Sequence, residues 1–107
     1  MIYLNGTIVA PDKARIDAAD RGLLLGDGLF ETLRAYRGKP FRLADHLQRL
    51  SRAAAELGIP LPVDAPDLAT AVADVLAANR LQAADAAIRI TLTRGAGPRG
   101  LLPPENP

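Results

Sequence analysis

The sequence predicts an α+β fold, an antiparallel β-sheet with two helices packed on one face. Stretches in which apolar and polar residues alternate, as in a β-strand, lie near both ends of the chain. Between them lie two stretches in which apolar residues recur at the spacing of an α-helix. The resulting order is two hairpins, two helices and a final strand, without the strand–helix–strand unit of a parallel sheet. At 107 residues the chain has the length of one domain.

A hairpin is expected at the amino terminus. Ile2–Leu4 and Thr7–Val9 flank Asn5-Gly6, a dipeptide that favours a type I′ turn because both residues tolerate positive φ. A further short strand is predicted at Ala14–Ala18. Three glycines within residues 22–28 then mark places where φ is positive or where the backbone approaches another group closely.

The stretch from Leu29 to Tyr36 alternates as a strand does. One face carries an aromatic ring, a hydroxyl, a guanidinium and a phenol, a mixture that suits either a pocket wall or a solvated sheet surface. The residues of this face are Phe30, Thr32, Arg34 and Tyr36. The opposite face is expected to join the core although it includes a carboxylate, and it consists of Leu29, Glu31, Leu33 and Ala35.

The chain is expected to reverse direction after this strand and form a hairpin. Arg37–Pro40 favours a turn, and Phe41–Leu43 is predicted as the short returning strand. A helix follows at Ala44–Leu57, and Gly58 ends it because glycine readily adopts the left-handed conformation that closes a helix. The helical spacing predicts a buried stripe made of Leu43, Leu47, Leu50, Ala54 and Leu57.

The second half of the chain holds another helix and the last strand. The helix is predicted at Asp67–Asn79, with Asp64 or Asp67 as its N-cap. Ala86–Thr93 alternates again and is predicted as a strand. A loop rich in glycine and arginine follows at residues 94–100, where it could close over a ligand or remain a solvated basic loop.

Composition narrows the classes of function. Thirteen basic and twelve acidic residues give a formal net charge of +1, which argues against a nucleic-acid-binding or anionic-lipid surface. The chain has no cysteine and a single histidine, His46, so neither a disulfide framework nor a metal site is expected. There is no secretory signal and no apolar run of membrane-spanning length, so a cytoplasmic location is expected.

Anion recognition is the chemistry that the side chains suit best. An arginine grips a phosphate or carboxylate through two parallel hydrogen bonds. Arg49 can alternatively form an ordinary i,i+4 ion pair with Asp45 on the helix surface. Lys13 and Lys39 are the only lysines, and neither has an apolar setting that would suit a Schiff-base residue. The arginines considered for anion binding are Arg49, Arg89, Arg94 and Arg99.

Three blocks of the sequence resemble a known family. Asp20-Arg21-Gly22, the run from Gly26 to Glu31, and His46-Leu47-Gln48-Arg49-Leu50 are similar to the amino-terminal small domain of the class IV (fold type IV) pyridoxal-phosphate enzymes. This family includes branched-chain aminotransferases, D-amino acid aminotransferases, (R)-selective amine transaminases and aminodeoxychorismate lyase. The resemblance covers essentially the whole chain and implies a small domain at residues 1–102, followed by the start of an interdomain linker at residues 103–107.

The resemblance implies roles for individual residues. Arg49 matches the arginine that binds the phosphate of pyridoxal 5′-phosphate (PLP), and Phe30 falls where the family places an aromatic side chain against the substrate pocket. Thr32 and Arg34 lie on the same strand face and would line the same wall. Arg99 matches an arginine that grips the substrate carboxylate in the D-amino acid enzymes, whereas Glu31 receives no role.

The resemblance also implies partners. The substrate would be an amino acid or an amino-chorismate-type small molecule, and the complete enzyme would be a homodimer. The Schiff-base lysine would lie in a carboxyl-terminal domain that follows Pro107, so no catalytic residue and no metal ligand is expected in this chain. The chain alone would be inactive.

Some residues depart from individual branches of the family. Leu101 stands where the D-amino acid enzymes have a histidine, and Leu25 stands where branched-chain enzymes have a tyrosine. Residues 94–100 are most similar to aminodeoxychorismate lyase and its aminotransferase-like relatives, so lyase and transaminase both stay open. The alternative is a stand-alone, non-catalytic binding or dimerisation module with the same fold, against which the retained site residues argue.

Overall fold

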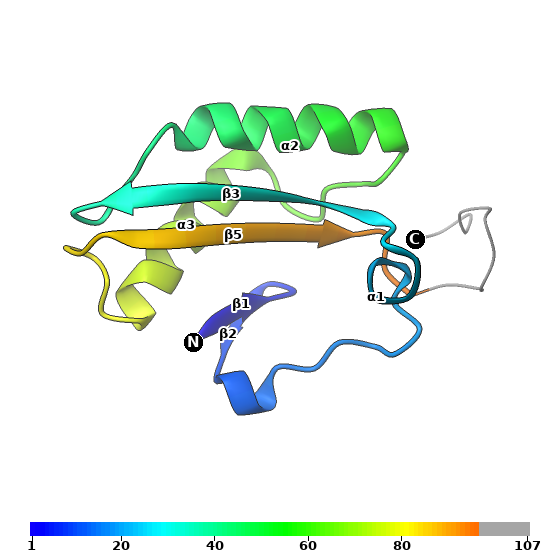
Figure 1. Ribbon diagram of the computed structural model, residues 1–107, viewed down its shortest axis with the longest axis horizontal. Helices are drawn as coiled ribbons and strands as arrows, with labels where there is room; N and C mark the ends of the chain where they lie inside the picture. The colour runs from blue at the N-terminus through cyan, green and yellow to red at the C-terminus, as the bar shows by residue number, and fades with distance from the viewer. Residues whose placement is uncertain (97–107) are drawn as a thin grey trace.

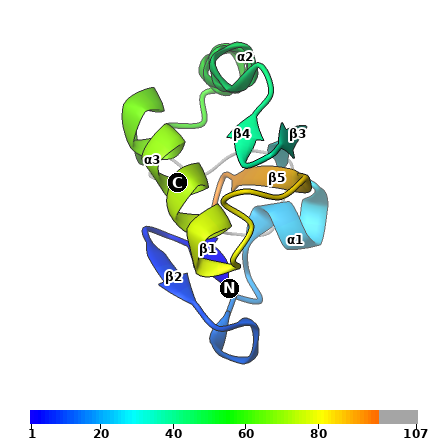
Figure 2. The same cartoon turned by 90° about the vertical axis from the view of Figure 1, so that its left-hand side faces the viewer.

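We describe residues 1–96 of a computed structural model of the chain; Arg99 and the predicted linker at residues 103–107 lie outside the described residues. A three-stranded antiparallel sheet forms the centre of the fold, with two long helices and a separate two-stranded hairpin around it (Figure 1). Figure 2 shows both long helices on the same side of the larger sheet. The predicted α+β architecture is therefore confirmed, although the two hairpins do not share one sheet.

The amino-terminal hairpin forms as predicted. Strands β1 (Ile2–Leu4) and β2 (Thr7–Val9) are joined by Asn5-Gly6, whose φ angles are 50° and 93°. The Met1 amino group donates to Oδ1 of Asn79 over 2.7 Å, and the Asn79 side-chain amide donates to the Met1 carbonyl over 3.0 Å. These two bonds attach the hairpin to the end of a helix that is distant in sequence.

The segment between the hairpin and the central strand differs from the prediction. Pro11–Lys13 form a single 3₁₀ turn, η1, and the strand predicted at Ala14–Ala18 is wrong, because this stretch has no strand with which to pair. A short helix, α1 (Arg21–Leu25), follows. The Asp20 carboxylate caps this helix by accepting a backbone N–H of its first turn over 2.8 Å, and Gly26 ends it with a φ of 66°.

The central sheet has the strand order β4-β3-β5, and both pairings are antiparallel. Strand β3 (Gly28–Tyr36) pairs along nearly all of its length with β5 (Ala86–Thr93). Strand β4 (Lys39–Pro40) pairs only with the last two residues of β3. Along the rest of that edge, the described part of the chain places no strand beside β3, so side chains from other elements can approach it.

The return from β3 is tighter than predicted. Arg37 and Gly38 have φ angles of 52° and 79°, so they form a two-residue turn, and pairing resumes directly at Lys39–Pro40. The strand predicted at Phe41–Leu43 is wrong, because the returning strand is over before Phe41 and a helix begins at Leu43.

The two long helices are α2 (Leu43–Leu57) and α3 (Ala65–Ala78). Helix α3 begins earlier than predicted because Asp64 is its N-cap, with a carboxylate oxygen that accepts the Asp67 N–H over 3.0 Å. Leu57 was predicted to be buried, but it is 50% exposed at the last residue of α2. The rest of the predicted stripe on α2 is buried or half-buried.

The core lies between the central sheet and the two long helices. Alternation along β3 turns one set of its side chains into this core and the other set away from it. The buried apolar residues are Leu33, Ala35, Leu47, Leu50, Ala54, Ile59, Ala71, Val72 and Leu76. The other face of β3 is left to carry polar and aromatic groups in contact with solvent.

Candidate functional site

The exposed face of β3 carries the side chains that were predicted to form a pocket wall. Phe30, Thr32 and Arg34 are all exposed, with Phe30 at 59%. The strand register places Thr32 opposite Arg89 of β5, and the Arg89 guanidinium lies 4.4 Å from the centroid of the Phe30 ring. The negative face of an aromatic ring attracts a cation at this distance. This surface of the sheet therefore combines an aromatic ring with two guanidinium groups.

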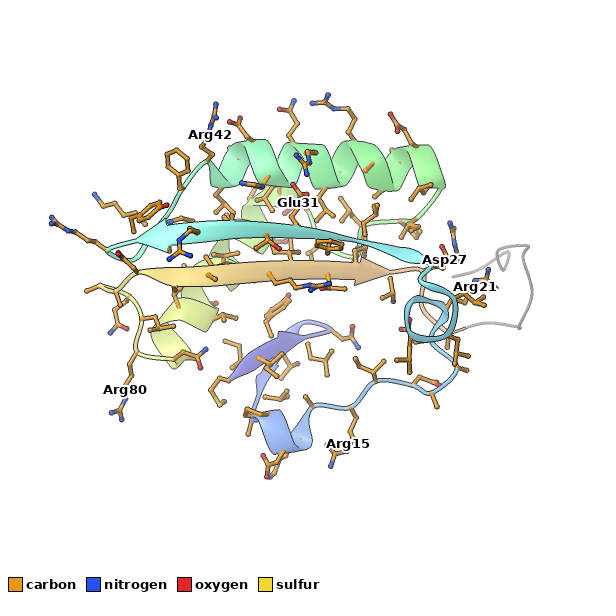
Figure 3. The ribbon with its side chains drawn as sticks, in the orientation of Figure 1. Arg15, Arg21, Asp27, Glu31, Arg42 and Arg80 are labelled. Carbon is orange, nitrogen blue, oxygen red and sulfur yellow. The ribbon has the colours of Figure 1, made fainter. Side chains whose placement is uncertain are left out.

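Glu31 lies on the opposite face of β3, which the helices cover. It is 5% exposed, and its Oε1 atom is 3.2 Å from Nε of Arg49 and 3.2 Å from Nδ1 of His46, both on α2. Figure 3 shows Glu31 between β3 and α2. The sequence indicates a carboxylate on the core face but gives it no role. Since a buried carboxylate needs charged or hydrogen-bonding partners, that carboxylate was the available signal for this cluster.

Arg49 pairs with Glu31 and not with Asp45. The i,i+4 ion pair considered from the sequence is wrong, because Asp45 lies 3.1 Å from Nε of Arg42 instead. Asp45 has a side chain that is 68% exposed, whereas that of Glu31 is 5% exposed. Solvent screens the buried carboxylate less, so its attraction for a guanidinium is stronger.

The guanidinium of Arg49 keeps most of its donors available. Its side chain is 77% exposed, and only Nε takes part in an ion pair within residues 1–96. The four N–H groups on the two terminal nitrogens make no hydrogen bond there and have the planar fork geometry that matches phosphate oxygens. Arg49 therefore presents exposed donors with the geometry that suits an anion.

The predicted phosphate-binding residue, Arg49, and the predicted substrate wall do not lie on one surface of the structure. Arg49 approaches β3 on the face of Glu31, whereas Phe30 and Thr32, the sequence neighbours of Glu31, lie on the opposite face. Both sets nevertheless flank one strand, in the part of β3 that β4 leaves uncovered. A ligand that contacts both sets must therefore reach around β3.

Arg94 is an internal structural residue and not a free anion-binding group. Its Nε donates over 2.9 Å to Oδ2 of Asp27, which also accepts from Nε of Arg21 over 2.8 Å. Figure 3 shows Asp27 and Arg21 at the same end of the sheet. The terminal nitrogens of Arg94 donate to the carbonyl oxygens of Leu57 and Gly58. The hydrogen bond from Arg21 is the main cause of a lowered pKa of Asp27; desolvation opposes it, and Arg94 adds to it.

The two lysines of the chain lie far from any enclosed setting. Lys13 in η1 and Lys39 in β4 are both exposed.

Within residues 1–96, no group of three or more His, Cys, Asp or Glu side chains could hold a metal ion. No helix in that range is long and apolar enough to cross a membrane. A groove of about 840 Å³ runs between α2 and α3, and none of the predicted site residues lines it.

The described residues thus form a small α+β domain with arginines on both faces of one strand. Residues 28–107 match the model of the class IV amino-transferase family, and the chain belongs to that family. The chain spans about one third of the length of the curated relatives that it matches. The match covers 35% of the length of one of these relatives and 34% of the length of another.

Solved structures of related proteins share this fold. A 4-amino-4-deoxychorismate lyase from Pseudomonas aeruginosa is 40% identical, with a TM-score of 0.69 over 85% of this chain and 32% of that one. The branched-chain amino acid aminotransferase from Escherichia coli is 30% identical, with a TM-score of 0.85 over 94% of this chain and 35% of that one. A hypothetical aminotransferase from Mycobacterium tuberculosis in a PLP-bound form is 32% identical, with a TM-score of 0.76 over 87% and 33%.

Proposed function

We propose that this chain supplies the phosphate-binding arginine and part of the substrate wall of a PLP-dependent lyase or transaminase. The observation that carries this proposal is the set of contacts made by the Arg49 guanidinium. A buried carboxylate holds one side of its guanidinium, and the remaining donors are exposed and without partners within residues 1–96. This is the arrangement expected of a side chain that is prepared to bind an anion.

The phosphate of PLP is the anion that this arrangement fits. A guanidinium stays charged at physiological pH and donates two parallel hydrogen bonds to phosphate oxygens. Arg49 would bind and orient that phosphate while its Nε remains paired with Glu31. When bound, PLP supplies an electron sink for the bonds at the amine-bearing carbon of the substrate. Within this chain, the residues would hold and orient the cofactor and exclude water from one side of it.

The substrate wall would consist of Phe30, Thr32 and Arg34. These side chains share the exposed face of β3, where the Phe30 ring gives apolar contact and Arg34 gives a positive charge. Arg89 contacts the Phe30 ring on the same face and adds a second guanidinium. Arg99, which lies outside the described residues, is proposed to bind a substrate carboxylate. An amino acid or an amino-chorismate-type compound has the carboxylate and the amine that such a wall requires.

The remaining parts of the site are proposed to come from outside these 107 residues. The lysine that holds the cofactor would belong to a second domain, joined through a linker that begins at residues 103–107, after a first domain at residues 1–102. Exposed Lys13 and Lys39 support this division, because a cofactor-binding lysine needs a more enclosed setting. The complete enzyme is proposed to be a cytoplasmic homodimer, and the chain by itself to be inactive.

Reductive trapping tests this assignment. The chain of 107 residues is mixed with stoichiometric PLP, reduced with borohydride and weighed by mass spectrometry, in parallel with the complete product of its gene. We expect no specific adduct on the short chain and one adduct on the complete product, at a lysine other than Lys13 or Lys39. A single adduct at either of those two lysines would contradict the proposal.

A further inference from the structure

We propose that Glu31 is a positioning residue that orients Arg49 for anion binding. This inference rests on the proposed function of Arg49 and extends it to a residue that contacts neither the cofactor nor the substrate. Glu31 is in β3, Arg49 is in α2, and the two are 3.2 Å apart at Oε1 and Nε. The pair thus links the strand that carries the substrate wall to the helix that carries the phosphate-binding residue.

The ion pair with Glu31 limits the conformations of the Arg49 side chain. An arginine side chain that is 77% exposed would, without a partner, be free to sample many rotamers. Binding an anion would then require that freedom to be lost at the moment of binding, which weakens affinity. The ion pair with Glu31 holds the Nε side of the guanidinium close to β3 and leaves both terminal nitrogens for a ligand. Glu31 therefore prepares Arg49 without occupying the donors that a phosphate needs.

The negative charge of Glu31 also acts on an anion bound by Arg49. A buried carboxylate beside a phosphate site repels the phosphate, so its charge alone would weaken binding. Simple removal of that charge should tighten binding of an anion, whereas loss of orientation should weaken it. The two roles of Glu31 therefore predict opposite signs, and the sign of the measured change distinguishes a positioning residue from a nearby charge.

His46 is a second partner of the Glu31 carboxylate. Its Nδ1 atom is 3.2 Å from the same Oε1 atom of Glu31, and it lies one helical turn before Arg49 on α2. With two partners on one oxygen, the carboxylate of Glu31 is itself fixed in place. The side chain is 5% exposed, and among the described residues no buried side-chain nitrogen or oxygen lacks a hydrogen-bond partner. Glu31 is consequently held firmly enough to transmit an orientation to Arg49.

The test compares the affinity of PLP with that of pyridoxal, which lacks the phosphate, in the complete gene product. Glu31→Gln keeps the shape of the side chain but removes its charge, and Glu31→Leu removes the acceptor and fills a similar volume. We expect Glu31→Leu to bind PLP about tenfold more weakly, which is the size of loss seen when a residue that orients a ligand-binding side chain is removed. Glu31→Gln keeps an acceptor oxygen for Arg49 and should lose less. Pyridoxal binding should be unchanged. Glu56→Gln, which changes an exposed carboxylate on α2, the helix of Arg49, should change neither affinity.

A double-variant cycle with Arg49→Ala separates the inference from the proposed function. If Glu31 acts through Arg49, adding Glu31→Leu to Arg49→Ala should change PLP affinity by less than about twofold. Unchanged or tighter PLP binding by both Glu31 variants would overturn the inference, as would an equal loss with and without Arg49. If Arg49→Ala alone left PLP affinity unchanged, the proposed function of Arg49 would fail, and the positioning role would fail with it.

Discussion

Arg94 donates to Asp27 through Nε over 2.9 Å, and this contact joins the residue that follows β5 to the residue that precedes β3. The terminal nitrogens of Arg94 extend the connection to the carbonyl oxygens at the end of α2, and Arg21 brings in α1 through the same carboxylate oxygen. One partly buried carboxylate thus connects four elements. This cluster stabilises the end of the sheet, in contrast to the pair of Glu31 and Arg49, which leaves donors exposed.

The first prediction concerns the stability of this cluster. Asp27→Asn should lower the free energy of unfolding by about 3 kcal/mol, because it removes the carboxylate charge that two buried guanidinium groups contact. Asp45→Asn is the matched control, since Asp45 and Arg42 form an exposed pair, and it should cost about 0.5 kcal/mol. Denaturant unfolding of the variants measures both values, and equal losses would refute the structural role of Asp27.

The second prediction is a pH dependence. Arg21, followed by Arg94, holds the pKa of Asp27 in the folded chain below its ordinary value of 3.8. A lowered folded-state pKa means that this stabilisation is fully present above pH 3.8 and is lost as the pH falls toward the folded-state pKa. The difference in stability between the parent chain and Asp27→Asn should therefore be constant from pH 5 to 7 and shrink below pH 3.8. A difference that grows on acidification would contradict this assignment.

The third prediction concerns the turn between β3 and β4. Gly38 has a φ of 79°, and a Cβ atom there would clash with the backbone carbonyl of Gln82. Gly58, at the end of α2, has a φ of 67° but open space around the same position. Gly58→Ala should cost about 1 kcal/mol from the left-handed conformation alone, and Gly38→Ala should cost clearly more. Thermal unfolding of the two variants checks this order, which equal melting temperatures would contradict.

The fourth prediction concerns the substrate. Arg99→Ala in the complete gene product should raise the Michaelis constant for substrates that carry a carboxylate, by roughly tenfold for the loss of one charged hydrogen-bonding partner. The Michaelis constant for amines without a carboxylate should stay the same. Steady-state kinetics on a pair of matched substrates measures this difference, and equal effects on both would remove Arg99 from the carboxylate site.

Sequence reasoning succeeded where one local pattern determines the outcome. The alternation of β3 correctly assigns Phe30 and Thr32 to the exposed face and Leu33 to the core, because side chains in a strand alternate with a period of two. Asn5-Gly6 likewise determines its own turn through positive φ at both residues. The predicted strand Ala86–Thr93 is confirmed with the same bounds for the same reason.

Sequence reasoning failed where the outcome depends on contacts between distant segments or on very short elements. Helix α1 has only five residues, too few for a helical pattern, although Asp20 and Gly26 are typical capping residues. The partner of Arg49 is Glu31, which lies in another element, whereas spacing along the helix favours Asp45. Similarly, nothing local distinguishes Arg94, which is buried in a cluster, from an arginine that is free to bind a ligand.

The central claim is that Arg49 binds the phosphate of PLP, and the most direct measurement is the affinity of the complete gene product for PLP and for pyridoxal. Arg49→Ala should weaken PLP binding by about 1.5 to 3 kcal/mol, roughly tenfold to a hundredfold, and leave pyridoxal binding unchanged. Arg52→Ala, which removes another exposed arginine of α2, should change neither affinity. Unchanged PLP affinity in Arg49→Ala, or an equal loss for PLP and pyridoxal, would contradict the claim.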